Sequence, residues 1–353
     1  IITKIDQYEE LINELKIYNG STSFSFREKM SRLAFTETAY YDAIISDYLN
    51  KISKIDFPKK KIIYGNLIEK LRYGENPHQQ SAIYSVGEDI KIKKIQGKDL
   101  SYNNYNDIFS ALNISKSLPK NTGTVIVKHT TPSGVSAQKN NLNSFKSALE
   151  CDPISAFGGV VSFNFRITKP IAIEVNKIFL EVIIANGFEK SALEILKKKK
   201  NVRLIDASNY LLNDILKFKS INKSMLVQTE DNLTFSKNDF KIVSKKKPSK
   251  LQLENLIFAF NICRHVKSNA IVLVKDKSTV GIGSGQTSRL DSCKIAINKM
   301  NQFFETKNEI VAASDAFFPF VDGIEKLVQS GVSAVIQPGG SIRDKEIISY
   351  ANE

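Results

Sequence analysis

The sequence predicts an α/β fold preceded by a helical segment. Near the start, Tyr8, Ile12 and Leu15 keep helical spacing before the stop signal Asn19-Gly20. After about residue 100, helical patterns alternate with short apolar runs, of which residues 124–128 are the clearest buried strand. A helix, a strand that ends in lysine and a turn then occur twice. This recurrence predicts two related subdomains.

Apolar periodicity supports each predicted element in order. The predicted helices cover residues 8–15, 26–49, 107–118, 144–150 and 251–266, with a further helix beginning near residue 288. The predicted strands cover residues 124–128, 160–163, 270–275, 278–285 and 309–312.

The length of 353 residues predicts more than one core. We expect a helical tail and linker over residues 1–64, a first subdomain over 65–214, a polar and lysine-rich connecting segment over 215–250, and a second subdomain over 251–353. Because the first residue is Ile, we also expect the chain to be a piece of a longer polypeptide.

The formal charge of +13 suggests an anionic partner, yet the pattern argues against nucleic acid. The lysine runs at residues 59–61, 197–200 and 245–247 adjoin prolines or close a helix, where they stay solvated. Aromatic residues that would stack on bases are not interleaved with them. A positive field of this kind suits small anionic substrates.

No apolar run reaches the ~18 to 20 residues of a membrane span, and no signal peptide is recognisable, so a cytoplasmic protein is expected. Cys151, Cys263 and Cys293 are odd in number and lack CxxC spacing. This predicts core thiols rather than disulfides or a structural zinc site.

The three histidines, His78, His129 and His265, all lie in distinctive stretches. Lys128 and His129 end the buried strand and precede a predicted breaker-rich turn over residues 130–134. A base beside a cation suits proton transfer combined with anion stabilisation. For the dipeptide alone, a solvated Lys and a hydrogen-bonded His that simply end a strand are favoured, so neighbouring stretches must decide.

Several further stretches combine glycine or proline with ligand-binding side chains. They cover residues 71–79, 151–161, 281–289, 314–322 and 337–344. Each also has a plain structural interpretation as a turn, a core segment or a helix start. The glycines of Gly281-Ile282-Gly283-Ser284-Gly285 follow neither the dinucleotide nor the Walker A spacing.

Taken together, the motifs LRYGENPHQ, GKDLSYNNYND, VKHTTPSGV, SAFGGVV, SNAIVLVKD, GIGSGQTSR, SDAFFPF and QPGGSIRD resemble the AICAR transformylase/IMP cyclohydrolase family. They follow the family order from about Gly65 to the end and are similar to the transformylase portion. The first ~64 residues resemble the helical tail of the cyclohydrolase domain, whose body lies outside this chain.

The resemblance implies formyl transfer from 10-formyltetrahydrofolate to the 5-amino group of AICAR in purine (IMP) biosynthesis, without a catalytic metal. It implies two cytidine-deaminase-like subdomains, although the zinc ligands H-x-E and P-C-x-x-C are missing, so deaminase activity is disfavoured. It also implies a homodimer with shared active sites, with neither nucleic acid nor membrane as a partner. Cyclohydrolase activity, a hydrolase reaction, is expected of the longer parent protein.

The family's functional residues map onto positions of this sequence. His129 matches the proton acceptor, Lys128 the group that stabilises the oxyanion or donates to the departing folate nitrogen, and Asn269 the residue that orients the formyl group. The positions that match substrate contacts are Arg72, Tyr73, Phe157, Gly158 and Glu181. The positions that match the folate side are Arg289, Leu290, Pro319, Phe320 and Asp322.

The sequence departs from the family pattern at three places. Residues 130–133 read Thr-Thr-Pro-Ser where many members have Ala-Asn-Pro-Cys, and residues 222–225 replace a usual glycine pair. Family members also continue beyond the position of Glu353 to an Arg, a Phe and a His that reach the nucleotide. The first two changes are expected to preserve function, whereas the third predicts weak AICAR binding.

Three alternatives remain open from sequence. A basic RNA-binding module predicts binding that collapses with salt. A nicotinamide-dependent oxidoreductase would use the loop at residues 281–285, but the acidic partner for the ribose cannot be identified. Lastly, the chain could act only as an assembly or folding unit.

Overall fold

A computed structural model of the chain describes residues 1–86, 90–212, 216–305 and 308–353. They form two compact units, one of residues 1–72 with 80–90 and one of residues 73–79 with 91–353. The predicted boundary between residues 214 and 215 lies outside the described residues, and the subdomain limits stay predictions. Among the described helices, none is long and apolar enough to cross a membrane.

The first unit contains two helices and a hairpin. A 3-10 turn (Ile5–Gln7) leads into α1 (Tyr8–Ile17), which ends at the predicted Asn19-Gly20 stop, and α2 (Phe24–Ile52) follows. The Ser23 hydroxyl accepts a 3.1 Å hydrogen bond from the Phe26 amide and so caps α2. Strands β1 (Asn66–Leu71) and β2 (Ser81–Ser85) pair antiparallel. Both helices predicted for this segment are confirmed.

The second unit is built on one large mixed sheet, in which ten strands can be counted over the described residues. In spatial order, the strands are β14 (Val332–Ile336), β13 (Ile310–Ser314), β11 (Ile271–Lys275), β12 (Ser278–Gly283), β5 (Thr131–Ser136), β4 (Thr124–Lys128), β6 (Val160–Phe163), β7 (Val182–Ala185), β8 (Arg203–Asp206) and β3 (Lys93–Gln96).

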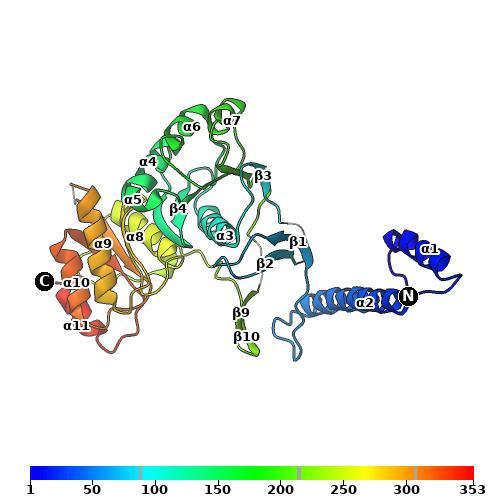
Figure 1. Cartoon of the computed structure of the whole chain (residues 1–353). Helices are drawn as coiled ribbons and strands as arrows, with labels where there is room; N and C mark the ends of the chain where they lie inside the picture. The colour runs from blue at the N-terminus through cyan, green and yellow to red at the C-terminus, as the bar shows by residue number, and fades with distance from the viewer. Residues whose placement is uncertain (87–89, 213–215, 306–307) are drawn as a thin grey trace. The chain divides into compact units, whose positions relative to one another are not determined.

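Helices cover both faces of this sheet, as Figure 1 shows. Helices α3 (Tyr102–Ser117) and α8 (Lys250–Cys263) share one core with alternate strand residues such as Val125 and Val272. Two further cores fill the opposite face, around Ile126 and around Ile271. The helices on or near that face are α4 (Asn141–Cys151), α5 (Pro153–Ala156), α6 (Lys169–Val175), α7 (Lys190–Leu196), α9 (Arg289–Phe303), α10 (Val321–Gln329) and α11 (Asp344–Tyr350).

The same topology occurs twice within the sheet. The order α3-β4-β5-α4-β6-α6-β7 corresponds to α8-β11-β12-α9-β13-α10-β14. In each half the hairpin's first strand has a second antiparallel neighbour, β6 or β13, which in turn pairs parallel with the next strand, β7 or β14. The predicted recurrence of helix, lysine-ended strand and turn therefore has a structural counterpart. β5 and β12 join the halves into one sheet.

The strands predicted over residues 124–128 and 160–163 are confirmed to the residue. The predicted turn over residues 130–134 is wrong, because Thr131–Ser136 is the central strand β5. The register of β4 against β5 shifts between Ile126 and Val127, and Pro132 lies opposite Val127 at this irregularity. A bulge tolerates proline within a sheet, which explains the error.

The segment predicted to connect the halves contains a hairpin that the sequence patterns did not indicate. Strands β9 (Lys217–Ile221) and β10 (Ser224–Gln228) pair with each other antiparallel and are largely exposed. A 3-10 turn (Lys237–Asp239) follows before α8 begins. The variant residues 222–225 thus form the turn and the start of β10, which agrees with a structural variation.

Glycines in the two hairpins let helices approach the sheet closely. A Cβ on Gly134 of β5 would lie 1.8 Å from the Ala148 carbonyl oxygen of α4, and one on Gly283 of β12 would lie 1.9 Å from the Ser292 carbonyl oxygen of α9. Backbone atoms cannot move away as a flexible side chain can. These glycines therefore set the spacing between sheet and helix in both halves.

We expect Gly134→Ala to lower the free energy of unfolding by about 1–3 kcal/mol or more, because an added methyl must push α4 away from β5. The midpoint of urea denaturation measures the change. Gly339→Ala is the control, since its Cβ would meet nothing closer than 3.5 Å. Equal midpoints for the two variants would contradict the close-approach argument.

Candidate active site

The β4–β5 hairpin turns on His129 and Thr130. Both residues have left-handed backbone conformations, with φ of 51° and 60°, as a type I′ turn requires. The His129 side chain is exposed, whereas Lys128 is half-buried and its Nζ donates a 2.8 Å hydrogen bond to the Phe157 carbonyl oxygen. The predicted base and cation thus lie side by side at the end of β4.

Helix α3 contacts this turn from one face of the sheet. The Asp107 carboxylate accepts a 2.6 Å hydrogen bond from the Thr130 amide, and the Ser110 hydroxyl donates one of 2.8 Å to the Thr130 carbonyl. Burial raises the pKa of Asp107, and the amides of Thr130 and His129 and the nearby imidazole offset only part of this rise. Sequence reasoning placed Asp107 at a helix start and missed this contact.

The predicted substrate residues Phe157, Gly158 and Glu181 lie at the same edge of the sheet as Lys128, because β4 and β6 are antiparallel and Val127 pairs with Val160. Gly158 has a left-handed φ of 73°, and Phe157 beside it is 60% exposed. The Glu181 amide donates to the Gly159 carbonyl oxygen at 2.9 Å, which fixes the neighbouring strand ends.

The Glu181 carboxylate has two partners in the second unit. It accepts a 3.0 Å hydrogen bond from the Asn104 amide group and lies 3.8 Å from an Arg203 guanidinium nitrogen. The other predicted substrate residues, Arg72 and Tyr73, fall on either side of the division between the two compact units. Arg72 belongs to the first unit and Tyr73 to the second.

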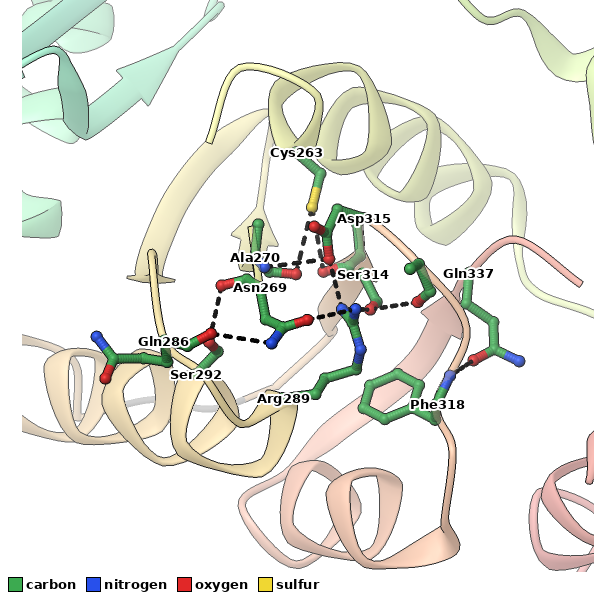
Figure 2. A network of polar contacts seen from close by, with 12 residues as sticks. Cys263, Asn269, Ala270, Gln286, Arg289, Ser292, Ser314, Asp315, Phe318 and Gln337 are labelled. Atoms are coloured by element: carbon green, nitrogen blue, oxygen red, sulfur yellow. Dashed lines mark hydrogen bonds and ion pairs between the residues drawn. The ribbon is translucent and has the colours of Figure 1, made fainter. Parts of the chain in front are cut away.

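Asn269 precedes β11 and belongs to a polar network, which Figure 2 shows. Its side-chain amide group donates to the carbonyl oxygens of Gln286 and Thr287 at 2.9 and 3.2 Å. Its side-chain oxygen accepts a 2.8 Å hydrogen bond from Arg289. The Ser292 hydroxyl donates to its backbone carbonyl at 2.8 Å. The whole amide is therefore held in one orientation.

Arg289 is buried and its guanidinium joins three partners in this network. Besides Asn269, it donates to the Ser314 hydroxyl at 2.6 Å and pairs with the Asp315 carboxylate. Burial alone would raise the pKa of Asp315, but hydrogen bonds from Arg289, Ser268 and the Ala270 amide hold it below its ordinary value. In this arrangement Arg289 faces Asn269 and Asp315, whereas the family pattern matches it to the folate side.

Of the other predicted folate residues, Pro319 and Phe320 lie on the loop between β13 and α10, Asp322 lies in the first turn of α10 and Leu290 in the first turn of α9. Pro319 and Asp322 are exposed and Leu290 is half-buried. The Phe320 ring is 51% exposed and has the Arg343 guanidinium 4.7 Å from its centroid. By contrast, Phe318 is fully buried, in agreement with the expectation that at least one ring of this stretch belongs to the core.

A pocket of about 220 Å³ opens beside the Lys128–His129 turn. The first half contributes Thr131, Pro132, Ser133, Cys151, Asp152 and Ser155 to its lining, and the second half contributes Ile282, Ser284 and Lys299. The Lys299 ammonium lies 2.7 Å from the Asp152 carboxylate. The pocket therefore depends on both halves of the sheet.

The glycines of the GIGSG loop serve helix packing. Gly281 and Gly283 lie within β12, and a Cβ on Gly281 would lie 2.2 Å from the Ala296 carbonyl oxygen. This geometry weakens the case for a dinucleotide-binding loop, because Gly281 and Gly283 are in close contact with α9 rather than open to a phosphate.

The remaining titratable candidates are structural or lie away from the turn. His265 contacts Ser117 at 3.2 Å, and burial lowers its pKa to about 3. Burial also raises the pKa of Cys151 and Cys293 to about 12, as expected of core thiols. Across the described residues, no three side chains of His, Cys, Asp or Glu gather in a way that could hold a metal ion.

Comparison with known proteins bears on this arrangement. Over its whole length the chain is similar to proteins called "Bifunctional purine biosynthesis protein PurH". It is 41% identical over 359 residues to the one from Aquifex aeolicus, of which it covers 70%. It is 42% identical over 359 residues to the one from Leptospira biflexa, of which it covers 69%, and 38% identical over 358 residues to the one from Elusimicrobium minutum, of which it covers 68%.

The sequence model of the AICARFT/IMPCHase bienzyme family matches residues 1–299. This match includes the Lys128–His129 turn, the Phe157 loop, Asn269 and Arg289. The relatives named above also match this chain over its whole length. The chain therefore belongs to the AICARFT/IMPCHase bienzyme family.

Proposed function

We propose that the Lys128–His129 turn and the Asn269–Arg289 network form the formyl-transfer site of this AICAR formyltransferase of purine biosynthesis, with 10-formyltetrahydrofolate as donor. The observation that carries the proposal is the exposed His129 on a held turn, next to Lys128 whose ammonium group is hydrogen-bonded, where both residues line a pocket to which both halves of the sheet contribute. The cyclohydrolase activity of the family belongs to the longer bifunctional parent.

His129 is proposed as the general base. The 5-amino group of AICAR is a weak nucleophile because its lone pair is delocalised into the imidazole carboxamide. As the amine nitrogen bonds to the formyl carbon, the His129 side chain accepts one of the amine protons. The tetrahedral intermediate then collapses with cleavage of the bond from the formyl carbon to the folate nitrogen. That nitrogen takes up a proton as tetrahydrofolate leaves.

Lys128 is proposed to stabilise the oxyanion of this intermediate or to protonate the departing nitrogen. In the structure its Nζ donates to a neutral backbone carbonyl oxygen of Phe157. A developing oxyanion is a stronger acceptor than that carbonyl, because the ammonium then faces a negative charge rather than a carbonyl dipole. The ammonium can therefore change partner as negative charge appears on the formyl oxygen.

Asn269 is proposed to orient the formyl group. Its amide has donors and acceptors already fixed by Gln286, Thr287 and Arg289. Because its amide group already donates to two carbonyl oxygens, contact with the formyl oxygen exchanges one of these partners, while Arg289 keeps the side chain in place. Arg289 supports this role by holding Asn269 and Asp315 together, besides its proposed place on the folate side.

The residues that match the family's substrate and folate contacts are proposed to bind the two substrates. The nucleotide contacts are Arg72, Tyr73, Phe157, Gly158 and Glu181, and the exposed Phe157 ring suits a flat heterocycle. The folate contacts are Leu290, Pro319, Phe320 and Asp322, together with Arg289. Side chains supply the base and the cation, so the proposed steps require no catalytic metal.

The cytidine-deaminase-like character of the two halves is a further proposal, supported by the repeated topology of the large sheet. Assembly as a homodimer with shared active sites and a cytoplasmic location are proposed on the family resemblance. Sedimentation velocity tests the dimer, and a monomer at all concentrations would contradict it.

We expect His129→Asn to reduce formyl transfer by about 10²-fold or more, because the amide cannot accept the amine proton. Asn tolerates the left-handed conformation, so the turn should persist. A spectroscopic assay with AICAR and 10-formyltetrahydrofolate measures the loss. The matched control is Asp276→Asn at the corresponding position of the β11–β12 turn, where φ is 49°. Full activity of His129→Asn would exclude it as the base.

We expect Arg289→Lys to lower kcat/KM by about 10-fold or more, because one ammonium cannot reproduce the guanidinium bonds to Asn269, Ser314 and Asp315. The same assay at varied folate concentration measures the change. Lys294→Ala on the exposed face of α9 is the control, since within the described part of the chain Lys294 pairs with Asp291 alone, at 3.0 Å. An equal kcat/KM for the two variants would contradict a role of Arg289 in the site.

A further inference from the structure

The repeated halves of the sheet hold their hairpin turns in the same way. In the first half, Asp107 of α3 accepts a 2.6 Å hydrogen bond from the Thr130 amide. In the second half, the Asn255 side-chain oxygen of α8 accepts one of 2.9 Å from the Lys277 amide. Thr130 and Lys277 are each the second residue of a left-handed turn, with φ of 60° and 55°.

The correspondence extends along both elements. Helices α3 and α8 begin after the capping residues Ser101 and Ser249, and Asp107 and Asn255 each stand six positions further on. The turns follow Lys128 and Lys275, the last residues of β4 and β11. Asp107 and Asn255 are therefore equivalent positions, and they differ by a carboxylate oxygen replaced by an amide group.

This difference separates the structural role of the position from its charge. A neutral Asn255 accepts the turn amide as Asp107 does, so holding the turn does not require a negative charge. The first turn residue differs too, since His129 stands where the second half has Asp276. In the first half, the turn carries His129 and the helix supplies the Asp107 carboxylate. In the second half, the turn carries Asp276 and the helix supplies the neutral amide of Asn255.

We propose that Asp107 is a positioning residue for His129, holding the turn through the Thr130 amide and stabilising by its negative charge the imidazolium formed when His129 accepts the substrate proton. This inference rests on the proposed role of His129 as the base. The Ser110 hydroxyl, which donates 2.8 Å to the Thr130 carbonyl, assists only in holding the turn.

The charges around Asp107 agree with this assignment. The titratable groups that act on it are His129, on the turn, and Glu181, at the start of β7. His129 favours the ionised carboxylate, whereas Glu181 and burial disfavour it. Protonation of His129 therefore gains a nearby counter-charge, and removal of the Asp107 charge should make His129 a weaker base.

The test compares Asp107→Asn, which keeps a side-chain acceptor for the turn, with Asp107→Ala, which removes both acceptor and charge. NMR titration of the imidazole resonances measures the pKa of His129, identified by the signal that His129→Asn lacks. We expect Asp107→Asn to make His129 a weaker base and to lower kcat by about tenfold. The acidic limb of the pH–rate profile should shift to lower pH with it.

Two outcomes decide the proposal. If Asp107→Asn matches the wild type in His129 pKa and kcat while Asp107→Ala alone loses activity, the residue only holds the turn and the proposal fails. If Asp107→Asn lowers the imidazole pKa and kcat at an unchanged unfolding midpoint, the proposal stands; Asp107→Ala, which also loses the acceptor for the Thr130 amide, is expected to lower the midpoint as well. Absence of formyl transfer in the wild type would refute the proposed function, whereas a lowered His129 pKa would still support the charge interaction.

Discussion

The site depends on the pairing of β5 with β12 at the centre of the large sheet. Ser136 and Ser278 lie opposite each other with their hydroxyls 2.8 Å apart, and the Val135 amide donates to the Thr279 hydroxyl at 2.9 Å. All these groups are buried, so leaving one of them unpaired would be costly. Because the strands are antiparallel, the start of β5 and the end of β12 meet at one edge. The His129 turn and Asn269, which precedes β11, therefore lie at the same edge of the sheet.

The proposed reaction takes its functional groups from both of the repeated halves of the sheet. Both halves end a buried strand in lysine, but the first carries the imidazole and the second carries the Asn269–Arg289 network. The ion pair between Asp152 and Lys299, at 2.7 Å, adds a charged contact between α5 and α9 across the junction. Neither half alone presents the groups that the proposed reaction needs, which argues against either acting as a separate module.

Local patterns in the sequence were sufficient for the strand at residues 124–128 and for the paired Lys128 and His129. They failed at β5, because Pro132 and Gly134 signal a turn unless a bulge and a close helix are known. Asp107 was missed because its contact with Thr130 spans 23 positions of the chain. The six-residue spacing from Ser101 to Asp107 was visible in the sequence. Comparison with the same spacing from Ser249 to Asn255 would have drawn attention to Asp107.

The conformation of the His129–Thr130 turn explains why so many contacts converge on it. Left-handed backbone suits Gly, Asn and Asp, whereas Thr130 is β-branched and disfavours its φ of 60°. Residues in such conformations persist only where their surroundings determine them, at a cost of order 1–3 kcal/mol. Here α3 binds both the amide and the carbonyl of Thr130. The same helix that offsets the strain therefore places a carboxylate beside the proposed base, so stability and basicity at this turn are coupled through Asp107.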